Sequence, residues 1–437
     1  MSINPHHIVI VGGGAGGLEL ATRLGDKLGK RKNADITLID ESLTHLWKPL
    51  LHEVAAGTLD SHDDELDYLA QAHWHHFQFR LGRMDGLDRK RRQVFLAPTL
   101  GEQGKEIIPR RSFTYDTLVI AVGSISNDFG IPGVKEHCFF LDNRAQADHF
   151  QDVLLKNYIQ AQTRNESLRE GQLNVAIVGG GATGVELAAE LRNAARQLVA
   201  YGLDRINPER DVKLVIIQAL ERILPELPPA LSQSVQAELK KMKVEVRANE
   251  RVVKVMEEGL YTKSGLFIPA AITVWAAGIK APDFLRNLDG LETNHLNQLV
   301  ARQTLQTTRD DDIFAFGDCA ACPRPSTNSP VPPRAQAAHQ QASMLVRSLT
   351  NRIKGKPLPV YVYKDYGSLI SLGQYSTVGN LMGNIIGNVT IGGLFARFMY
   401  ISLYKLHQRA LHGILRVILI TLANLLTRPT RPRLKLH

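Results

Sequence analysis

The 437-residue sequence predicts an α/β protein with two Rossmann-like dinucleotide-binding domains and a C-terminal amphipathic helical membrane anchor. Two glycine-rich loops, each between a short apolar segment and a helical one, predict the two domains. The loops begin at Gly12 and Gly179, so one supersecondary unit occurs twice. A basic and apolar segment at about residues 394–427 predicts the anchor.

Length and composition agree with this fold class. A chain of 437 residues is too long for one compact core and favours two or three domains. Hydrophobic residues make up 44% and charged residues 22%, close to ordinary soluble usage, so the composition indicates neither a largely disordered chain nor a polytopic membrane protein. Three cysteines are too few for a disulfide framework, and no signal peptide is visible, so we expect an intracellular protein.

The first glycine loop is predicted to bind a dinucleotide. Its two strands are expected at residues 7–11 and 34–40, and the helix between them at 18–29. Gly12 permits the tight turn, Gly14 lets the backbone reach a pyrophosphate, and Gly17 lets helix and strand pack closely. Asp40 ends the second strand, where its carboxylate can accept hydrogen bonds from the adenosine ribose. A glycine-rich turn in another kind of doubly wound domain is the alternative.

The second loop repeats this arrangement with one difference. Its strands are expected at 173–178 and 212–218, and its helix at 185–202. Its three glycines are Gly179, Gly181 and Gly184. Gln218 stands where an acid would repel the 2′-phosphate of NADPH. Because a glutamine can bond either nucleotide, we expect NADH to be accepted and NADPH not to be strongly excluded, with Arg222 helping to hold a phosphate. The alternative is that other contacts still enforce NADH.

Three later apolar segments are expected to complete the two domains. They span 115–124 with Gly123, 270–278 with Gly278, and 311–320 with Gly317 and Asp318. Glycines there let the backbone pass close to a bound nucleotide. The first loop together with Gly317-Asp318 indicates FAD, whose extended molecule reaches both. Asp318 is expected to bond the ribityl or pyrophosphate region, although an aspartate at this place can also cap a helix.

These segments give the expected domain boundaries. The FAD-binding domain is formed by 1–142 and 285–352, and the NAD(P)H-binding domain by 143–284. The C-terminal domain covers 353–437. Within this scheme residues 323–333 predict a loop, and 334–352 predict a helix.

The motifs resemble the type II NADH:quinone oxidoreductases, the single-subunit, non-pumping respiratory NADH dehydrogenases of bacteria. The resemblance runs from Ile8 to the C-terminal tail and includes HLWKPLLHEVAAGTLD (45–60), GGGATGVELAAEL, VWAAGIKAPDFL, FGDCAACPRP and PPRAQAAHQ. It implies a two-dinucleotide-binding flavoprotein fold, FAD held without a covalent link, NADH as donor and a membrane quinone as acceptor. Many relatives carry Glu in place of Gln218, which leaves the donor preference open.

Within the resemblance, Ala335-Gln336-x-Ala338-x-Gln340 is similar to the family's quinone-site signature. Gln336 and Gln340 are four residues apart and therefore share one helix face, from which neutral amides can bond a quinone carbonyl. Spacing alone would equally describe two surface glutamines. Lys364 is a quinone-pocket candidate through the resemblance only.

Two further residues have alternative interpretations. Lys48, in the segment Lys48-Pro49-Leu50, is expected to pack against the flavin ring. The alternative is that this segment is an ordinary ordered loop. Glu186 lies in the first turn of the second loop's helix, where it either complements the helix dipole or reaches the nicotinamide and flavin. In the second case it positions the donor or relays a proton.

Cys319-x-x-Cys322 follows Gly317-Asp318 directly. We expect two inert thiols beside the flavin, with copper(I) binding as the minor hypothesis, because there is no second Cys/His pair at ligand spacing. A membrane-bound redox or copper sensor is accordingly one alternative function. Another is a sulfide:quinone oxidoreductase, which shares FAD and quinone but needs redox cysteines at the flavin.

The C-terminal tail is expected to bind an anionic membrane surface. Of the net charge of +9, eight positive charges follow Asp365, after which there is no acidic residue. A helical projection places Lys405, Arg409 and Arg416 on the side of Arg397, opposite an apolar face that Gly413 divides. The longest strongly apolar run has about ten residues, against roughly 20 needed to span a bilayer. We expect the tail to lie on the cytoplasmic face of the cell membrane; packing on the protein or in a homodimer is the alternative, and nucleic acid is not expected.

Overall fold

The computed structural model describes residues 5–61, 65–101, 104–163, 169, 171–325, 327, 329–372, 377–383, 387–427 and 434–435. The chain forms two compact units. The first unit comprises Met1–Trp47, Glu65–Ile125 and Ile279–Lys364. The second comprises Lys48–Asp64, Ser126–Gly278 and Asp365–His437.

A six-stranded sheet forms the centre of the first unit, in the order β23-β24-β11-β1-β2-β5. Its strands, in sequence order, are β1 His6–Val11, β2 Ala34–Asp40, β5 Gln78–Leu81, β11 Thr117–Ile120, β23 Gln306–Thr307 and β24 Asp310–Ala315. All neighbours are parallel except β23 and β24. Ile8, Ile10 and Leu38 are fully buried, as expected for parallel strands covered on both faces.

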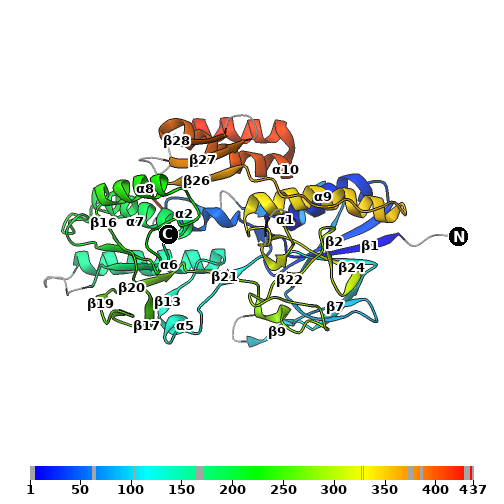
Figure 1. Ribbon diagram of the computed structural model, residues 1–437, viewed down its shortest axis with the longest axis horizontal. Helices are drawn as coiled ribbons and strands as arrows, with labels where there is room; N and C mark the ends of the chain where they lie inside the picture. Colours follow the sequence, from blue (N-terminus) through cyan, green and yellow to red (C-terminus); the bar gives the residue numbers. More distant parts are fainter. Residues whose placement is uncertain are drawn as a thin grey trace. The chain divides into compact units, whose positions relative to one another are not determined.

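Helices α1 (Ala15–Leu24) and α9 (Ala335–Ile353) lie side by side in the first unit, and α1 also contacts β1 and β2 (Figure 1). The sequence predicted one helix over 18–29, but α1 begins at Ala15 and continues as a π-helical turn, Gly25–Gly29. A Cβ on Gly25 would lie 1.9 Å from the His75 carbonyl oxygen. Gly25 therefore lets the segment at His75 approach more closely than any side chain would allow.

Smaller elements complete the first unit. They are β3 Thr44–His45, β4 Leu66–Asp67, α4 Tyr68–Trp74, β6 Met84–Asp88, β7 Gln93–Leu96, β8 Thr99–Leu100, β9 Glu106–Ile108, β10 Arg111–Thr114, η4 Asp283–Leu285, β22 Leu299–Val300, η5 Gly317–Cys319 and β25 Ala320–Ala321. The short strands β12 Ile125–Ser126 and β21 Ile279–Lys280 stand where the chain passes from one unit to the other.

The second unit is built on a parallel five-stranded sheet in the order β13-β20-β14-β15-β16. These strands are β13 Cys138–Phe139, β14 Val175–Val178, β15 Leu214–Ile217, β16 Val244–Arg247 and β20 Ile272–Trp275. Its helical elements are η2 Lys48–Leu50, α2 Leu51–Ala56, α5 Val134–His137, α6 Arg144–Thr163, α7 Ala182–Ala200 and α8 Pro229–Lys241. An antiparallel sheet of β17 Val252–Met256, β18 Gly259–Thr262 and β19 Phe267–Pro269 adjoins them.

The C-terminal part of the second unit contains an antiparallel sheet and a long helix. The strands are β26 Gly367–Ser371, β27 Thr377–Gly383 and β28 Gly387–Gly392. Helix α10, Gly393–Thr427, contacts all three and breaks at Gly413, whose φ is 76°. This confirms the expected division of the tail helix. None of the described helices is long and apolar enough to cross a bilayer.

The units divide at other residues than the expected domain boundaries. The chain enters the second unit at Ser126 rather than 143, because β13 pairs with β20 in the second sheet. It leaves at Gly278 rather than 284. Residues 48–64 also belong to the second unit, where α2 packs on α6 and α7.

A buried carboxylate links the two helices of the first unit. Glu19 on α1 is only 1% exposed and lies 2.7 Å from the Arg23 Nη1 atom and 2.5 Å from the His339 Nδ1 atom on α9. Arg23 also donates to the Ser343 hydroxyl at 2.6 Å. The bond to Glu19 is the largest influence on the pKa of His339 and raises it.

We predict that His339→Ala lowers the thermal unfolding temperature more at pH 6 than at pH 9. Because the folded pKa of His339 is raised, its ionic contribution is complete below the unfolded pKa and is lost as the pH rises through the folded value. Calorimetry at both pH values measures the difference, with the exposed His295→Ala as control. An equal loss at both pH values would contradict the prediction.

Candidate dinucleotide and quinone sites

The two glycine loops have nearly the same backbone geometry. Gly12 has φ of +102° and Gly179 of +119°, and their N–H groups donate to the carbonyls of Ile39 and Ile217 at 2.8 and 2.9 Å. A Cβ on Gly17 would lie 1.8 Å from the Gly12 oxygen, and one on Gly184 would lie 2.0 Å from the Gly179 oxygen. Only glycine allows the helix to approach the strand so closely.

The middle glycine of each motif stands before open space. α1 begins directly after Gly14, and α7 directly after Gly181. Among the described residues, no atom lies within 4 Å of a Cβ built on either glycine. Since the first amides of a helix have no partner within it, both loops present N–H donors and a positive dipole end to this space. The residues present therefore fit a diphosphate at each loop.

Asp40 holds the first loop as well as ending β2. Its two carboxylate oxygens accept hydrogen bonds from the N–H groups of Gly13 at 2.6 Å and Ser42 at 2.9 Å. The Tyr68 hydroxyl donates to the Gly13 carbonyl at 2.7 Å. Burial raises the pKa of Asp40, opposed by these backbone bonds. Each oxygen retains a lone pair with which to accept a ribose hydroxyl.

Gln218 occupies the equivalent place after β15 but makes different contacts. Its amide donates to the Arg222 carbonyl at 3.2 Å, and the Leu224 N–H donates to Gly180, as the Tyr68 hydroxyl does to Gly13. The Arg222 guanidinium donates to three carbonyls of its own turn, those of Leu224, Pro225 and Leu227. The guanidinium thus braces its own turn, and its expected help in holding a phosphate stays a prediction.

The strand ends predicted for the flavin meet in the first unit. The Ser124 hydroxyl donates to the Asp318 carboxylate at 2.9 Å and so joins the turn at Gly123 to the turn at Gly317. Both glycines have positive φ, +69° and +74°. No side chain caps η5, and Asp318 lies within it, so the interpretation of Asp318 as a helix cap receives no support.

Sequence reasoning missed the residue that fixes this turn from α9. The buried Gln341 accepts a hydrogen bond from the Gly317 N–H at 2.8 Å. Its only signal in the sequence was its place beside Gln340, in the motif that resembles the quinone signature.

Gln340 is engaged by the backbone of Lys364. Its amide nitrogen donates to the Lys364 carbonyl at 2.7 Å, and its oxygen accepts the Lys364 N–H at 3.0 Å and the Tyr361 hydroxyl at 3.5 Å. These contacts tie Gln340 to the 361–364 segment, and its expected bond to a quinone carbonyl stays a prediction. Gln336 is half-buried one turn earlier, and the Lys364 side chain is exposed.

Two other predicted cofactor residues lie in the second unit. Gly278 has φ of +69° and accepts a hydrogen bond from Asn127 at 3.2 Å. A Cβ there would lie 2.5 Å from the Phe129 ring. The Lys48 Nζ atom lies 3.7 Å from the Asp142 carboxylate. Its expected packing against the flavin ring stays a prediction.

Glu186 lies in a buried cluster on α7. Its carboxylate accepts the Ser371 N–H at 2.8 Å and lies 3.8 Å from the Nδ1 atom of His52 on α2. Burial raises the pKa of Glu186 to about 8, opposed by the bond from Ser371 and reinforced by the charges of Glu53 and Glu190. Burial likewise lowers the pKa of His52 to about 4. At neutral pH this environment favours a protonated Glu186 and a neutral His52.

Cys319 and Cys322 are fully buried free thiols. The Cys319 thiol donates to the Phe316 carbonyl at 3.3 Å, and the Cys322 thiol to the Arg302 carbonyl at 3.7 Å. Burial raises the pKa of each to about 12. In the part of the chain that the structure describes, no three His, Cys, Asp or Glu residues are grouped to hold a metal ion.

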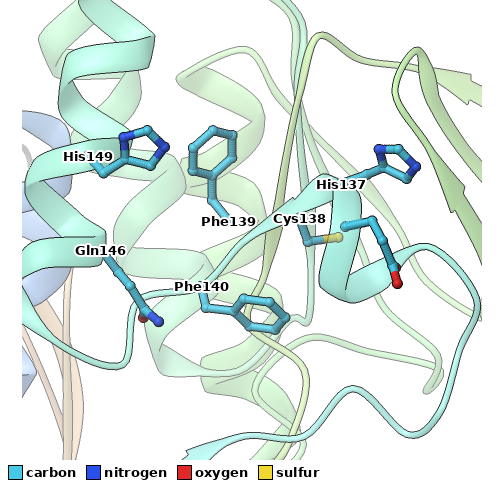
Figure 2. A pocket seen from close by; sticks show the side chains of 7 residues that line it. His137, Cys138, Phe139, Phe140, Gln146 and His149 are labelled. Carbon is cyan, nitrogen blue, oxygen red and sulfur yellow. The ribbon is translucent and has the colours of Figure 1, made fainter. Parts of the chain in front are cut away.

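A cavity of about 260 Å³ lies apart from the predicted site residues, between α5, β13 and α6 of the second unit. Figure 2 shows Gln146 and His149 reaching it from α6, opposite the 137–140 segment. The ring centroids of Phe139 and His149 are 5.6 Å apart. Phe140 also lines it, and none of its lining residues is a predicted site residue.

The fold and the paired loops define a nucleotide-dependent oxidoreductase. The family described as pyridine nucleotide-disulphide oxidoreductases matches residues 6–342. The chain is 45% identical over 444 residues to the type II NADH:quinone oxidoreductase of Haemophilus influenzae, covering 99% of this chain and 100% of that protein. It belongs to the type II NADH:quinone oxidoreductases, a family of flavin-dependent enzymes, and catalyses electron transfer from NADH to a quinone.

Solved structures share the fold. The structure of NDH2 from Plasmodium falciparum in complex with NADH has a TM-score of 0.78 at 19% identity, covering 92% of this chain and 94% of that one. The sulfide:quinone oxidoreductase from Aquifex aeolicus has a TM-score of 0.71, also at 19% identity, covering 93% and 92%. This second likeness concerns the fold alone, so the alternative activity has only a distant neighbour.

We predict that Gly181→Ala raises the KM for NADH at least tenfold, about 1.4 kcal/mol, without lowering thermal stability. The added methyl group enters the open space before α7 and meets no described protein atom. Gly184→Ala is the matched comparison, because its Cβ would lie 2.0 Å from the Gly179 oxygen and should destabilise the fold. Steady-state kinetics and thermal unfolding of both variants check this. An unchanged KM in Gly181→Ala would contradict it.

Proposed function

We propose that this NADH:quinone oxidoreductase holds FAD without a covalent link at the first loop and NADH at the second, and reduces a membrane quinone beside α9. The proposal rests on a difference between two otherwise matching loops, namely the chemistry of the side chain that closes each one. Asp40 closes the first with a carboxylate suited to an adenosine ribose, whereas Gln218 closes the second with a neutral amide. The test is donor and acceptor kinetics of variants at the second loop and the tail.

The proposed FAD site combines the first glycine loop with the later turns at Gly123 and Gly317 of the first unit. Its residues are Gly12, Gly14, Gly17, Asp40, Gly123, Gly317 and Asp318, with Lys48 as a further candidate for the flavin ring. When bound, the flavin accepts a hydride from the nicotinamide and passes two electrons to the quinone. The protein's part is to hold the diphosphate at the start of α1 and to fix the opposite turn through Ser124 and Gln341.

The proposed donor site comprises Gly179, Gly181, Gly184, Gln218 and Gly278. Gln218 is 8% exposed and carries no charge, so it neither repels nor pairs with a 2′-phosphate. The Arg222 guanidinium is already engaged by the carbonyls of its own turn. NADH is accordingly the donor, and NADPH is not strongly excluded.

We predict that Gln218→Glu lowers kcat/KM for NADPH at least tenfold and leaves that for NADH within threefold. The new carboxylate repels the 2′-phosphate but can still accept the 2′-hydroxyl of NADH. Steady-state rates with a short-chain quinone measure both donors. Gln218→Met, which is neutral and of similar length, is the control for loss of the amide. A natural preference for NADH above about a hundredfold would sink the proposal for Gln218, since that ratio corresponds to about 2.7 kcal/mol.

The proposed quinone site lies along α9. Gln336 is the residue proposed to contact the quinone, while Gln340 positions the 361–364 segment that ends in Lys364. Neutral amides suit this task because they bond carbonyl oxygens without burying a charge. Glu186, whose pKa is raised to about 8, is proposed to supply a proton during quinone reduction. The reaction is proposed to proceed without proton pumping.

The tail is proposed to bind the anionic cytoplasmic face of the cell membrane. Beyond Gly413 the helix α10 exposes a group of large apolar side chains, namely Ile414, Leu415, Ile418, Leu419, Leu422 and Leu426. Leu415 and Leu426 are 75% and 79% exposed, which is costly in water. Arg409 and Arg416 are exposed on the same helix and can meet lipid phosphates. Apolar insertion flanked by basic charge is typical of an interfacial helix.

We predict that Leu415→Asp/Leu419→Asp lowers binding to phosphatidylglycerol vesicles at least tenfold, while NADH oxidation with a water-soluble quinone stays within twofold. The matched control is Leu100→Asp/Ile107→Asp, which places charge on two similarly exposed apolar residues outside the tail. Vesicle co-sedimentation measures binding. Loss of a homodimer, with vesicle binding unchanged, would instead assign the apolar group to a subunit interface.

The buried thiols are proposed to be inert. Cys319 and Cys322 are fully buried, and both bond to backbone carbonyls, so neither is poised as a thiolate. A copper-binding or redox-sensing function would need these thiols to become accessible. Electron transfer from NADH to a quinone requires no such change.

A further inference from the structure

The overall reaction needs a proton from water. Oxidation of NADH by a quinone balances as NADH + H⁺ + Q → NAD⁺ + QH₂. The hydride carries one of the two hydrogens, and the second must enter as a proton in each turnover. A buried donor such as Glu186 must therefore be reprotonated every cycle by some group that reaches solvent.

His52 has an unpaired buried nitrogen beside Glu186. Its side chain is 3% exposed, and its Nε2 atom has no hydrogen-bond partner among the described residues. The ring also makes a hydrogen bond with the backbone of Pro49, and its other nitrogen, Nδ1, lies 3.8 Å from the Glu186 carboxylate. Leaving a polar atom buried without a partner is energetically unfavourable. Such an atom in a folded protein calls for an explanation beyond packing.

The unpaired nitrogen faces a second carboxyl group, which reaches solvent. The Glu53 Oε1 atom lies 3.9 Å from His52 Nε2, and the Glu53 side chain is 24% exposed, against 10% for Glu186. Glu53 and His52 are neighbours on α2, which packs against α7. The imidazole thus stands between an outer and an inner carboxyl group, with one ring nitrogen toward each.

We infer that Glu53, His52 and Glu186 form a proton relay that reprotonates Glu186 from solvent once per turnover. The inference rests on the proposed role of Glu186 as proton donor to the quinone. In each passage the Glu53 O–H bond breaks and an Nε2–H bond forms on His52, after which the Nδ1–H bond breaks and an O–H bond forms on Glu186. Glu53 then takes a proton from solvent, and His52, left with its proton on Nε2, returns to the Nδ1–H tautomer before the next turnover; no electron moves.

The electrostatics of the cluster support this direction. His52 is neutral while Glu186 is protonated, because burial lowers the pKa of the imidazole. Once Glu186 has given up its proton, its negative charge 3.8 Å away favours a protonated His52. The separations of 3.8 and 3.9 Å exceed hydrogen bonds, and catalytic contacts commonly shorten when substrate binds.

The test separates the two half-reactions by rapid mixing of the purified holoenzyme. Flavin reduction by NADH without quinone consumes no relayed proton, whereas reoxidation by a short-chain quinone does. We expect His52→Gln and Glu53→Gln to slow reoxidation at least tenfold and to leave reduction within twofold. Glu53→Asp, which keeps the acid, should restore at least half of the wild-type rate. Glu190→Gln is the matched control, because Glu190 also acts on Glu186 through its charge but lies on α7 itself.

Glu186→Gln, measured in parallel, distinguishes the relay from the proposed function. If Glu186→Gln slows reoxidation but Glu53→Gln and His52→Gln do not, the relay is overturned and the role of Glu186 stands. If none of the three slows reoxidation, both are overturned. Equal slowing by Glu190→Gln would also overturn the relay, since charge alone would then explain the effect. If His52→Gln fails to fold, Glu53→Gln still decides the test, because the Glu53 side chain is partly exposed and its substitution should be tolerated.

Discussion

The close approach of a helix start to the end of a strand, made once in each unit, is the constraint on which the other features depend. Gly17 and Gly184 admit the carbonyls of Gly12 and Gly179 at distances that no Cβ would tolerate. This contact aims the first amides of α1 and α7 at the space in front of Gly14 and Gly181. The strands, the closing side chains Asp40 and Gln218 and the later glycine turns take their places around those two helix starts.

The sequence predicted the parts of the fold that follow from local chemistry. Positive φ at Gly12 and Gly179, the acid at the end of β2 and the break at Gly413 all arise from what a single residue type can or cannot do. Helix α9 and the tail helix were likewise predicted within about two residues of their bounds, from helical composition in the first case and from a basic and apolar segment in the second.

The parts that the sequence did not predict depend on partners far along the chain. Gln340 and Gln341 are adjacent glutamines, yet one holds the 361–364 backbone and the other holds Gly317. The pairing of Glu19 with His339 spans more than 300 residues and leaves no local pattern. The strands β26, β27 and β28 escaped notice because they are rich in glycine, serine and asparagine, residues that ordinarily indicate turns.

Each unit is assembled from three separate stretches of chain, and this has a consequence for how the protein is made. The sheet of the first unit stays open at β11 until β24 has been synthesised, and α1 lacks its neighbour until α9 follows. In the second unit, Glu186 receives its backbone hydrogen bond only from Ser371, near the C-terminal end. A nascent chain on the ribosome therefore exposes both nucleotide loops long before either unit can close. Each unit takes its last stretch of chain from beyond residue 278, and the tail helix α10 is among the last segments to emerge.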